Sequence, residues 1–523
     1  MRYARSVADG HRRGRDRRAV MLRGPGGRAR FAGDAPSVAV IGGGIAGLSA
    51  ATVLAERGAR VTLYEREPGL GGRLAGRPTE IADGTTVTMS RGFHAFFRQY
   101  YNLRGLLRRV DPGLHTLTGL PDYPLRHSAG LHDSFARVPR TPPFSVLGFV
   151  ALSPTFGLRD LVRMRPRAAL PLLDVRVPDV YEQLDEVSAH DFLKRIRFPE
   201  AAHHLAFEVF SRSFFADPRK LSAAELVLMF HIYFLGSSEG LLFDVPDEPF
   251  PQALWEPLRR YLEGHNAQVR TGSAVENVTP LVGGGHDVTA DGRTRRHDAL
   301  VLALDTEGLR KAVAASPGLG DASWRAKVDG LRTAPPFLVS RLWLDRPVAP
   351  DRPGFLGTSG YPPLDNVSVL DRWEGEAARW ARRHRGSVLE LHAYAVSPDA
   401  DRAGVETAAI EQLHRVYPET RSARVVDVRH EWRADCPLFP VGGYPHRPGV
   451  RTPDPTVTVA GDLVRTELPV ALMERAATSG FLAANALLER WGVRGQTLWT
   501  VPRAGRSAVL RGLAALGTSR TRD

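Results

Sequence analysis

The segment from residue 37 to residue 67 constrains the fold of this chain more than any other. It reads SVAVIGGGIAGLSAATVLAERGARVTLYERE, which is an apolar strand pattern, three closely spaced glycines, a helical pattern, a second strand pattern and an acid. Gly42 permits a tight turn after the first strand, Gly44 lets the backbone approach a pyrophosphate, and Gly47 lets the helix expected at 45–57 pack closely on the sheet. The pattern therefore predicts a dinucleotide-binding βαβ unit.

Two further features of this unit fit a dinucleotide. The helix begins at Ile45 and Ala46, where free backbone N–H groups favour phosphate. Glu65 closes the second strand, where a carboxylate can accept hydrogen bonds from ribose hydroxyls. A glycine-rich turn alone is usually only a turn, but here the strand, helix, second strand and acid are all in register.

A second glycine turn follows immediately, in the stretch REPGLGGRL at residues 66–74. Gly71 and Gly72 would bring more backbone N–H groups to a diphosphate, and Arg66 and Arg73 would add positive charge beside it. The alternative interpretation of this stretch is an ordinary loop.

A strand pattern near the other end of the chain also ends in a glycine and an acid, Gly461 and Asp462. A helix is expected to follow at 470–490, and its first turns contain Met473 and Ala476 among small residues. Small side chains suit a helix that lies against a cofactor, although a plain strand–helix pair in a large α/β core would have the same pattern.

Taken together, the two glycine turns and the C-terminal motif resemble the FAD-dependent amine oxidase and carotenoid desaturase superfamily. The resemblance implies FAD as cofactor, with Asp462 at the ribityl and phosphate region, the helix start near Met473 and Ala476 at the flavin ring, and Val275 at the adenosine half. It implies an α/β fold with a Rossmann-like FAD-binding domain of the amine-oxidase (GR2) type and an interleaved α+β substrate domain. A methyltransferase that uses S-adenosylmethionine would not explain the second glycine turn or the C-terminal motif.

The chain has 523 residues, too many for one ordinary core, and its patterns interleave. Apolar helices are expected at 198–215 and 223–236, either buried or lining a cavity, and strands of a second sheet at 335–345 and 387–396. The predicted organisation is a disordered arginine-rich leader at 1–36, an FAD-binding domain at 37–115, 255–330 and 451–495, a substrate-binding domain with a helical lid at 116–254 and 331–450, and a basic tail at 496–523.

The formal net charge of +13 does not indicate a nucleic-acid partner. Residues 1–30 contain ten arginines and two acids, so 10 − 2 = 8 of the 13 charges belong to the leader and the remainder of the chain is only mildly basic. No secretory signal pattern and no run of roughly 20 apolar residues is present, so a cytoplasmic protein is expected. Cys436 is the only cysteine and the histidines lack metal-ligand spacing, so neither an intrachain disulfide nor a metal site is expected.

The stretch SRGFHAFFRQYYNL at residues 90–103 is unusually aromatic, and it lies soon after the second glycine turn. Its residues resemble the corresponding stretch of the isorenieratene synthase family, the carotene desaturase/methyltransferases of the same superfamily. The resemblance extends over about residues 37–492. It implies an FAD-dependent carotenoid oxidoreductase that desaturates the β-ionone ring of β-carotene with 1,2-methyl migration, giving an aromatic φ end group. The predicted substrate-binding residues are Phe93, Phe96, Phe97, Tyr100 and Tyr101.

The chemistry of that reaction gives these residues a role. A β-ring has a carbon that carries two methyl groups, so it passes through ring cations before it becomes aromatic, and aromatic faces stabilise cations in an apolar site. His94 is the candidate proton acceptor, because its ordinary pKa lies near the working range. The alternative is that the cluster is simply core and His94 a satisfied buried histidine. Glu225, Glu239 and Asp244 are further candidate acceptors for which surface or capping roles are favoured.

Two other functions stay open at this point. One is a different flavin enzyme, either a desaturase or isomerase of linear carotenes or an amine oxidase. The other is a non-catalytic carotenoid-binding flavoprotein. Because carotenoids dissolve in bilayers, peripheral contact with the inner face of the cell membrane is expected, with the apolar helices between about 140 and 240 at the mouth of the substrate tunnel.

Overall fold

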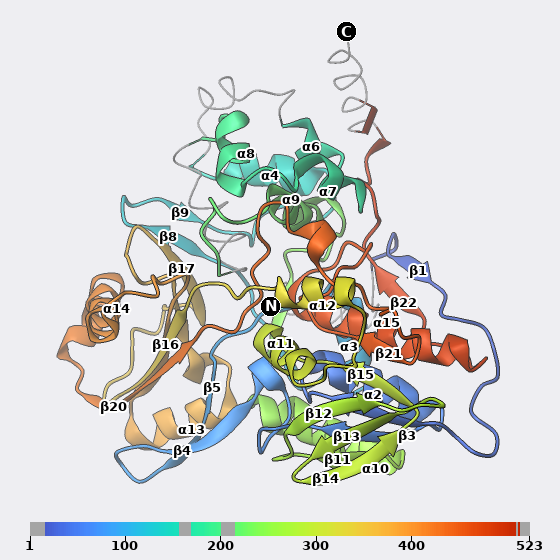
Figure 1. Cartoon of the computed structure of the whole chain (residues 1–523). Coiled ribbons are helices and arrows are strands. Elements are labelled where there is room, and N and C mark those ends of the chain that lie inside the picture. Colours follow the sequence, from blue (N-terminus) through green and yellow to red (C-terminus); the bar gives the residue numbers. More distant parts are fainter. Residues whose placement is uncertain (1–15, 156–168, 200–214, 509–510, 513–523) are drawn as a thin grey trace.

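The computed structural model describes residues 16–155, 169–199, 215–508 and 511–512. Figure 1 shows three regions that share one centre: a parallel sheet with its helices at the lower right, a large mixed sheet at the left, and a layer of helices above both. The three regions are connected repeatedly by the chain, so none of them is a contiguous stretch of sequence.

The parallel sheet has five strands in the order β11-β3-β2-β15-β21. Its strands are apolar on both faces, as parallel strands covered by helices require. They come from three separated parts of the chain, which is the arrangement expected of the FAD-binding domain, although the exact domain boundaries stay a prediction. The strands are β2 (Ser37–Ile41), β3 (Arg60–Tyr64), β11 (Gln268–Arg270), β15 (Ala299–Leu302) and β21 (Val457–Val459).

Two helices on this sheet, α2 (Ile45–Glu56) and α15 (Leu472–Arg490), pack directly against each other although they are more than 400 residues apart. Gly480 makes this contact possible, because a Cβ atom there would lie 2.2 Å from the carbonyl oxygen of Ala46. The sequence motifs at the two ends of the chain thus meet in one layer.

The remaining elements of this region surround the sheet. The antiparallel sheet β12-β13-β14 and the helices α11 and α12 lie beside it, and α10 follows a short π-helical turn, η6. Their bounds are β12 (Val275–Pro280), β13 (His286–Ala290), β14 (Arg293–His297), η6 (Pro251–Trp255), α10 (Glu256–Gly264), α11 (Thr306–Ala314) and α12 (Ala322–Asp329).

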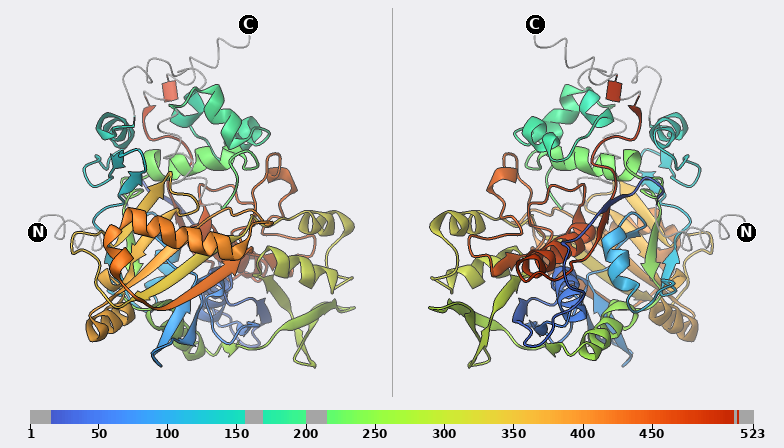
Figure 2. Two further views of the ribbon diagram at one scale, coloured as in Figure 1. Left: turned by 90° about the vertical axis from the view of Figure 1, so that its left-hand side faces the viewer. Right: turned by 90° about the vertical axis from the view of Figure 1, so that its right-hand side faces the viewer.

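The second region is a seven-stranded sheet in the order β20-β16-β19-β18-β17-β8-β9. Figure 2 shows α14 (Arg402–Val416) lying across one face of it, and the strand residues beneath that helix form a separate apolar core. The helix α13 (Gly375–His384) packs against the strand β19 of this sheet. The strands are β8 (Leu125–His127), β9 (His132–Asp133), β16 (Phe337–Leu344), β17 (Phe355–Ser359), β18 (Asn366–Val369), β19 (Ser387–Ala393) and β20 (Val425–Arg433).

The third region is the helical layer above the two sheets. The expected helix at 223–236 is present as α9 followed by the π-helical turn η5, whereas most of the expected helix at 198–215 lies outside the described residues. The helices are α4 (Phe144–Leu152), α6 (Leu170–Leu173), α7 (Asp179–Leu184), α8 (Ala189–Arg195), α9 (Ala223–Phe230) and η5 (His231–Leu235). Across the described part of the chain, no helix combines the length and the apolarity needed to cross a membrane.

Short elements connect the regions. The hairpin β4–β5 runs from the second glycine turn toward the large sheet, and a small sheet in the order β6-β10-β7 holds the aromatic stretch next to α3. These elements are η1 (Gly72–Leu74), β4 (Gly76–Glu80), β5 (Thr86–Ser90), β6 (Phe96–Phe97), α3 (Tyr101–Leu107), β7 (Leu117–Gly119) and β10 (Phe243–Pro246), and the remaining 3-10 turns are η7 (Leu370–Arg372), η8 (Pro418–Ser422) and η9 (Tyr444–His446).

The predicted disordered leader at 1–36 is wrong for its described part. Residues 20–22 form β1 (Val20–Leu22), which pairs with β22 (Leu498–Thr500) at the start of the predicted basic tail. Asp16 is buried and accepts a 2.8 Å hydrogen bond from the backbone N–H of Ser238. The arginine-rich composition suggested disorder, but pairing with a strand from the other end of the chain supplies the backbone hydrogen bonds that order this segment. Residues 1–15 lie outside the described part of the chain.

Candidate active site

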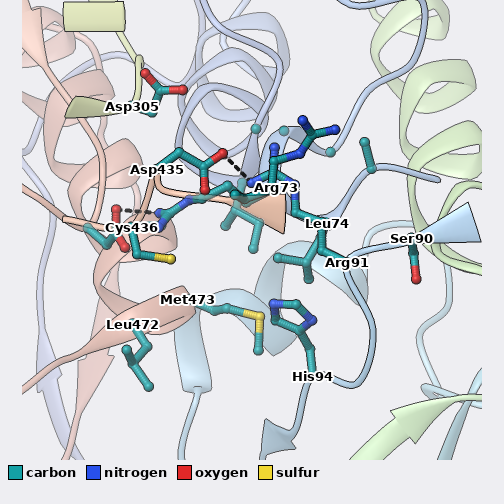
Figure 3. Close-up of a pocket in the computed structure, with 18 of the residues that line it drawn as sticks. Arg73, Leu74, Ser90, Arg91, His94, Asp305, Asp435, Cys436, Leu472 and Met473 are labelled. Carbon is teal, nitrogen blue, oxygen red and sulfur yellow. Dashed lines mark hydrogen bonds and ion pairs between the residues drawn. The ribbon is translucent and has the colours of Figure 1, made fainter. Parts of the chain in front are cut away.

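A single cavity of about 1100 Å³ extends from the edge of the parallel sheet to the large mixed sheet. Both glycine turns, the C-terminal Gly461 and Asp462, and the aromatic stretch contribute to its lining. Figure 3 shows the middle of this cavity, where Arg73, His94 and Met473 approach one another from three different segments.

The two glycine turns lie against each other at one end of the cavity. The backbone N–H of Gly71 donates to the carbonyl of Gly43 at 2.9 Å, and Gly44 and Gly71 form an isolated bridge. Gly42 has a φ of 109°, and a Cβ atom there would lie 2.2 Å from the carbonyl oxygen of Ala303. A Cβ atom on Gly44, in contrast, would meet only the Cα of Gly72, at 3.9 Å, so the backbone at Gly44 is open for a ligand to approach.

Gly47 is the one member of the predicted cofactor set that does not line the cavity. A Cβ atom there would lie 1.9 Å from the carbonyl oxygen of Gly42, so this glycine serves the close packing of α2 on the turn. The members that do line the cavity are Gly42, Gly44, Ile45, Ala46, Glu65, Arg66, Gly71, Gly72, Arg73, Val275, Gly461, Asp462, Met473 and Ala476.

Glu65 braces the first glycine turn as well as lining the cavity. Its Oε2 accepts from the backbone N–H of Gly43 at 2.7 Å, and its Oε1 accepts from the N–H of Glu67 at 2.9 Å. Burial nevertheless raises the pKa of Glu65 above its ordinary value. A carboxyl oxygen has two lone pairs, so both oxygens keep capacity to accept from ribose hydroxyls.

Arg73 and Asp462 bring the second glycine turn and the C-terminal motif together through an ion pair at 2.6 Å. Burial opposes the charge of Arg73, but the Asp462 carboxylate raises the pKa of the guanidinium above its ordinary value. Cys436 lies beside this pair, and burial raises the pKa of its thiol to about 11, so the thiol is protonated and unreactive at neutral pH.

These observations fit a dinucleotide with an attached ring system. The lining combines the start of helix α2, the carboxyl group of Glu65 and the guanidinium of Arg73. At Gly44 the only atom within 4 Å of an added Cβ is the Cα of Gly72, which leaves room for a ligand. Within the described residues, no group of three or more metal-ligating side chains is present.

His94 lies in the middle of the cavity. Its Nδ1 lies 3.0 Å from the carbonyl oxygen of Gly92, and because a carbonyl can only accept, Nδ1 carries the proton. Nε2 therefore has the lone pair of the neutral ring. Burial lowers the pKa of His94 to about 4, so the imidazole is neutral at physiological pH.

The predicted aromatic set divides into two groups. Phe93, Phe97 and Tyr100 line the cavity, whereas Phe96 and Tyr101 do not, so the prediction that all five bind substrate is wrong for these two. Phe96 and Phe97 are neighbours on the strand β6 and point to opposite faces, which puts Phe96 into the core beneath α2. Tyr101 begins α3 and hydrogen-bonds to Ser237 at 3.1 Å in a different core.

Other aromatic residues, which the sequence did not single out, complete the chamber. Phe93 stacks on Phe355 with ring centroids 4.3 Å apart, and Phe97 contacts Tyr233 at 4.6 Å. Tyr123 contacts Phe355 at 4.7 Å. Further aromatic side chains in the lining are Phe135, Phe215, Phe243, Phe337 and Tyr394. They come from separated segments, and no sequence pattern connects them.

A polar patch formed by β18, β19 and the residue that follows β19 was also not predicted from the sequence. His392, Tyr394 and Asn366 line the cavity, and Glu390 is fully buried next to His392. The sequence signal was the alternation in LELHAYAV at 389–396, which places every second residue on one face of a strand.

The acids considered as further proton acceptors have structural partners. Glu225 pairs with Arg475 and Arg447, each at 2.8 Å, and Asp244 pairs with Arg98 at 3.0 Å. Both acids are completely buried, so the surface or capping role favoured for them is wrong. Their partners come from distant segments, which no local pattern reveals. Glu239 accepts from the backbone N–H of Asp16 at 3.0 Å.

Comparison with known proteins agrees with this geometry. The chain is 80% identical over 514 residues, covering 98% of this chain and 99% of the other, to a carotenoid phi-ring synthase of Streptomyces griseus. It is 28% identical to a carotenoid phi-ring synthase of Chlorobaculum tepidum, covering 89% and 90% of the two chains. The solved structure of putrescine oxidase bound to putrescine superposes with a TM-score of 0.63 at 17% identity, covering 87% of this chain and 99% of that one.

The family described as flavin containing amine oxidoreductase matches residues 45–488. This match and the shared fold confirm the predicted α/β fold class, the FAD cofactor and the oxidoreductase class. Because the match spans far more than half of the chain, this protein belongs to the flavin-containing amine oxidoreductase family.

Proposed function

We propose that this protein converts the β-ring end group of β-carotene into an aromatic φ-ring, with 1,2-migration of a methyl group. The observation that carries the proposal is the single cavity that connects the dinucleotide cradle with a chamber of aromatic side chains. The 80% identity to a carotenoid phi-ring synthase over nearly the whole chain supports the same reaction.

The reaction requires no external methyl donor. Aromatisation removes four hydrogens from each ring, as two hydrides and two protons, and the second methyl on the ring's quaternary carbon moves to the neighbouring carbon. When bound, FAD would supply the hydride acceptor, and because it takes up one hydride at a time, an external two-electron acceptor would have to reoxidise it between the two oxidations of each ring. The residues proposed to hold FAD are Gly42, Gly44, Ile45, Ala46, Glu65, Arg66, Gly71, Gly72, Arg73, Val275, Gly461, Asp462, Met473 and Ala476.

The protein's own task is to stabilise a cation in a site without water. Phe93, Phe97 and Tyr100 are proposed to present ring faces to the substrate, together with Phe355 and Tyr233. A desolvated ring face contributes about 0.5–2 kcal/mol to a nearby cation, so several such faces together offset much of the cost of forming charge there.

His94 is proposed to accept a proton at Nε2. His94 Nδ1 donates its proton to the carbonyl oxygen of Gly92, so the lone pair of Nε2 is available at neutral pH. The low pKa of His94 makes it a weak base, but a proton beside a carbocation is strongly acidic and a weak base accepts it.

Peripheral contact with a membrane is proposed at α4. Three of its apolar side chains are unusually exposed: Phe144 at 61%, Leu147 at 62% and Leu152 at 55%. Arg137 and Arg140 are exposed just before this helix and add positive charge that anionic lipid attracts. A carotenoid dissolved in the bilayer would then enter from this side of the molecule.

The test is incubation of purified, FAD-loaded protein with β-carotene in liposomes, followed by mass and absorption spectra of the pigment. We expect a product with every carbon retained and four hydrogens lost per converted ring. If β-carotene is unchanged while a linear carotene or an amine reduces the flavin, the protein is a different flavin oxidase. If β-carotene binds without reducing the flavin under anaerobic conditions, the protein is a carotenoid carrier.

A further inference from the structure

The strand β19 and the residue after it carry three chemically active side chains in a row beside the cavity. Glu390 and His392 alternate along β19 and share one face, while Leu389 and Leu391 point into the core under α14. Tyr394 follows directly after the strand. His392 and Tyr394 line the cavity, and Glu390 lies behind them, away from solvent.

His392 lies between Tyr394 and Glu390 and contacts one of them with each ring nitrogen. His392 Nδ1 lies 2.7 Å from the hydroxyl oxygen of Tyr394, and His392 Nε2 lies 3.7 Å from Glu390 Oε2. Arg341 on β16 binds the other carboxyl oxygen of Glu390, Oε1, at 2.6 Å. Within the described part of the chain, neither His392 Nε2 nor Glu390 Oε2 has a closer hydrogen-bond partner.

The position of each proton follows from what the groups can accept. Burial raises the pKa of Glu390, but Arg341 and His392 outweigh it and lower this pKa to about 2, so Glu390 is a carboxylate and can only accept. The nitrogen that faces it, His392 Nε2, therefore carries the proton. His392 Nδ1 then has the lone pair and accepts from the O–H of Tyr394, whose oxygen also accepts from Asn366 Nδ2 at 3.0 Å.

We propose that Tyr394, His392 and Glu390 form a proton relay that takes one of the two protons released by each substrate ring. A ring C–H bond breaks, and its electron pair forms a double bond of the aromatic ring. The proton passes to the oxygen of Tyr394 as the phenol proton moves to His392 Nδ1. The resulting imidazolium is held by the Glu390 carboxylate, whose charge Arg341 otherwise balances. The relay rests on the proposed function.

The position of Gly92 relates this relay to His94. A Cβ atom on Gly92 would lie 2.5 Å from His392 Nε2, so only glycine lets the aromatic stretch pass this close to the relay. The carbonyl of the same residue holds His94 Nδ1. Gly92 thus lies beside two proposed proton acceptors, which matches the two protons that each ring gives up.

The experiment compares FAD-loaded wild-type protein with Tyr394→Phe, His392→Asn and the double variant. Tyr361→Phe is the matched control, because Tyr361 belongs to the same domain, is largely buried and does not line the cavity. Flavin content, the anaerobic rate of flavin reduction by β-carotene in liposomes, and the rate of aromatic product formation are measured separately.

We expect Tyr394→Phe to retain flavin and to lower the rate of aromatic product formation by about 10²–10⁴-fold, with partly dehydrogenated pigment accumulating. We expect His392→Asn to have a similar effect and the double variant to lose no more than the larger single loss, because the two residues act as a unit. A merely structural role would give losses that add and a lower flavin content.

Aromatic product formation within about threefold of wild type in both single variants would overturn the relay while leaving the proposed function intact. Loss of flavin in Tyr394→Phe, with product formation per bound flavin unchanged, would equally overturn it and make Tyr394 a packing residue. If the wild-type protein itself aromatises no β-carotene, the proposed function fails and the relay fails with it.

Discussion

His94 shows how one backbone contact decides what a side chain offers to a substrate. The Gly92 carbonyl fixes the tautomer, and burial holds the ring neutral, so a residue that titrates near neutral pH in water becomes a constant acceptor here. The same environment also makes it a weak base, which suits an acidic carbocation and would not suit proton removal from an unactivated carbon.

This environment predicts an unusual pH dependence. The pKa of His94 is lowered to about 4, so the neutral form persists on acidification until that pH. We expect the rate of ring aromatisation to stay flat between about pH 7.5 and 5.5, where an ordinary histidine near 6.5 would gain its proton. His94→Asn keeps a donor for Gly92 but removes Nε2, and should lower the rate by about 10²–10⁴-fold.

A matched control is available for His94. His265 has the same type of contact, with Nδ1 2.9 Å from the carbonyl of Tyr261, but does not line the cavity. His265→Asn should leave aromatisation unchanged. Full activity of His94→Asn would remove His94 from the chemistry.

At the scale of single elements, α4 is built differently from the other helices of its layer. Ser145 donates to the carbonyl of Phe234 at 2.7 Å and Phe149 is buried, so one side of α4 is anchored to η5. Phe144, Leu147 and Leu152 on the same helix are exposed to solvent. An anchored helix with an unpaired apolar face is suited to a lipid surface.

This arrangement predicts that α4 controls binding to liposomes. Each exposed side chain should contribute about 1–2 kcal/mol on entering the apolar boundary, so replacing Phe144, Leu147 and Leu152 together by serine should weaken liposome binding by at least about a hundredfold. Co-sedimentation with anionic liposomes measures this. Val282→Ser is the control, because Val282 is fully exposed in a different region. Equal binding of the triple variant and wild type would place the membrane contact elsewhere.

At the scale of the whole molecule, Glu225 holds the helical layer to the FAD-binding region. It lies on α9 and pairs with Arg475 on α15 and with Arg447, and all three side chains are buried. Arg447 also lies over the rings of Tyr181, Phe439 and Tyr444. Removing the acid that forms ion pairs with both arginines leaves two buried positive charges without that partner.

Glu225→Gln should therefore lower the free energy of unfolding by about 3–5 kcal/mol at pH 7. Burial opposes the carboxylate, but the two arginines lower the pKa of Glu225 to about 2, below its ordinary value of 4.5. A carboxyl with a lowered folded-state pKa stabilises the fold fully above its unfolded pKa, and this contribution is lost as the pH falls from about 4.5 toward 2. The difference between wild type and variant should shrink over that range.

Urea unfolding at pH 7 and below pH 4 measures this difference. Glu419→Gln is the control, because the pKa of Glu419 is also lowered to about 2 by Arg352, but this pair is partly exposed. Its loss should cost no more than about 1 kcal/mol. An equal decrease of the free energy of unfolding in the two variants would show that burial of the Glu225 cluster does not increase its contribution to stability.

How much the sequence reveals depends on how local the signal is. The glycines at 42, 44 and 47 act within one strand–turn–helix unit, so their spacing predicted the βαβ unit, which is present. FAD was predicted from the resemblance to the superfamily and is confirmed by the family match. In the aromatic stretch the spacing did not indicate which ring faces the cavity. Phe96 and Phe97 are adjacent and equally apolar, and only the pairing of β6 with β10 decides that Phe97 lines the chamber.

The sequence by itself determined the FAD-binding fold, because its motifs make their turns and hydrogen bonds with neighbours along the chain. Only the tertiary structure decided the chemistry of the chamber. Phe93 meets Phe355, and Gly92 meets His392, across hundreds of residues, and no local pattern carries the information that these segments converge. Burial then keeps His94 neutral, and Arg341 and His392 keep Glu390 charged against the effect of burial. Both effects exist only once the three regions have packed together.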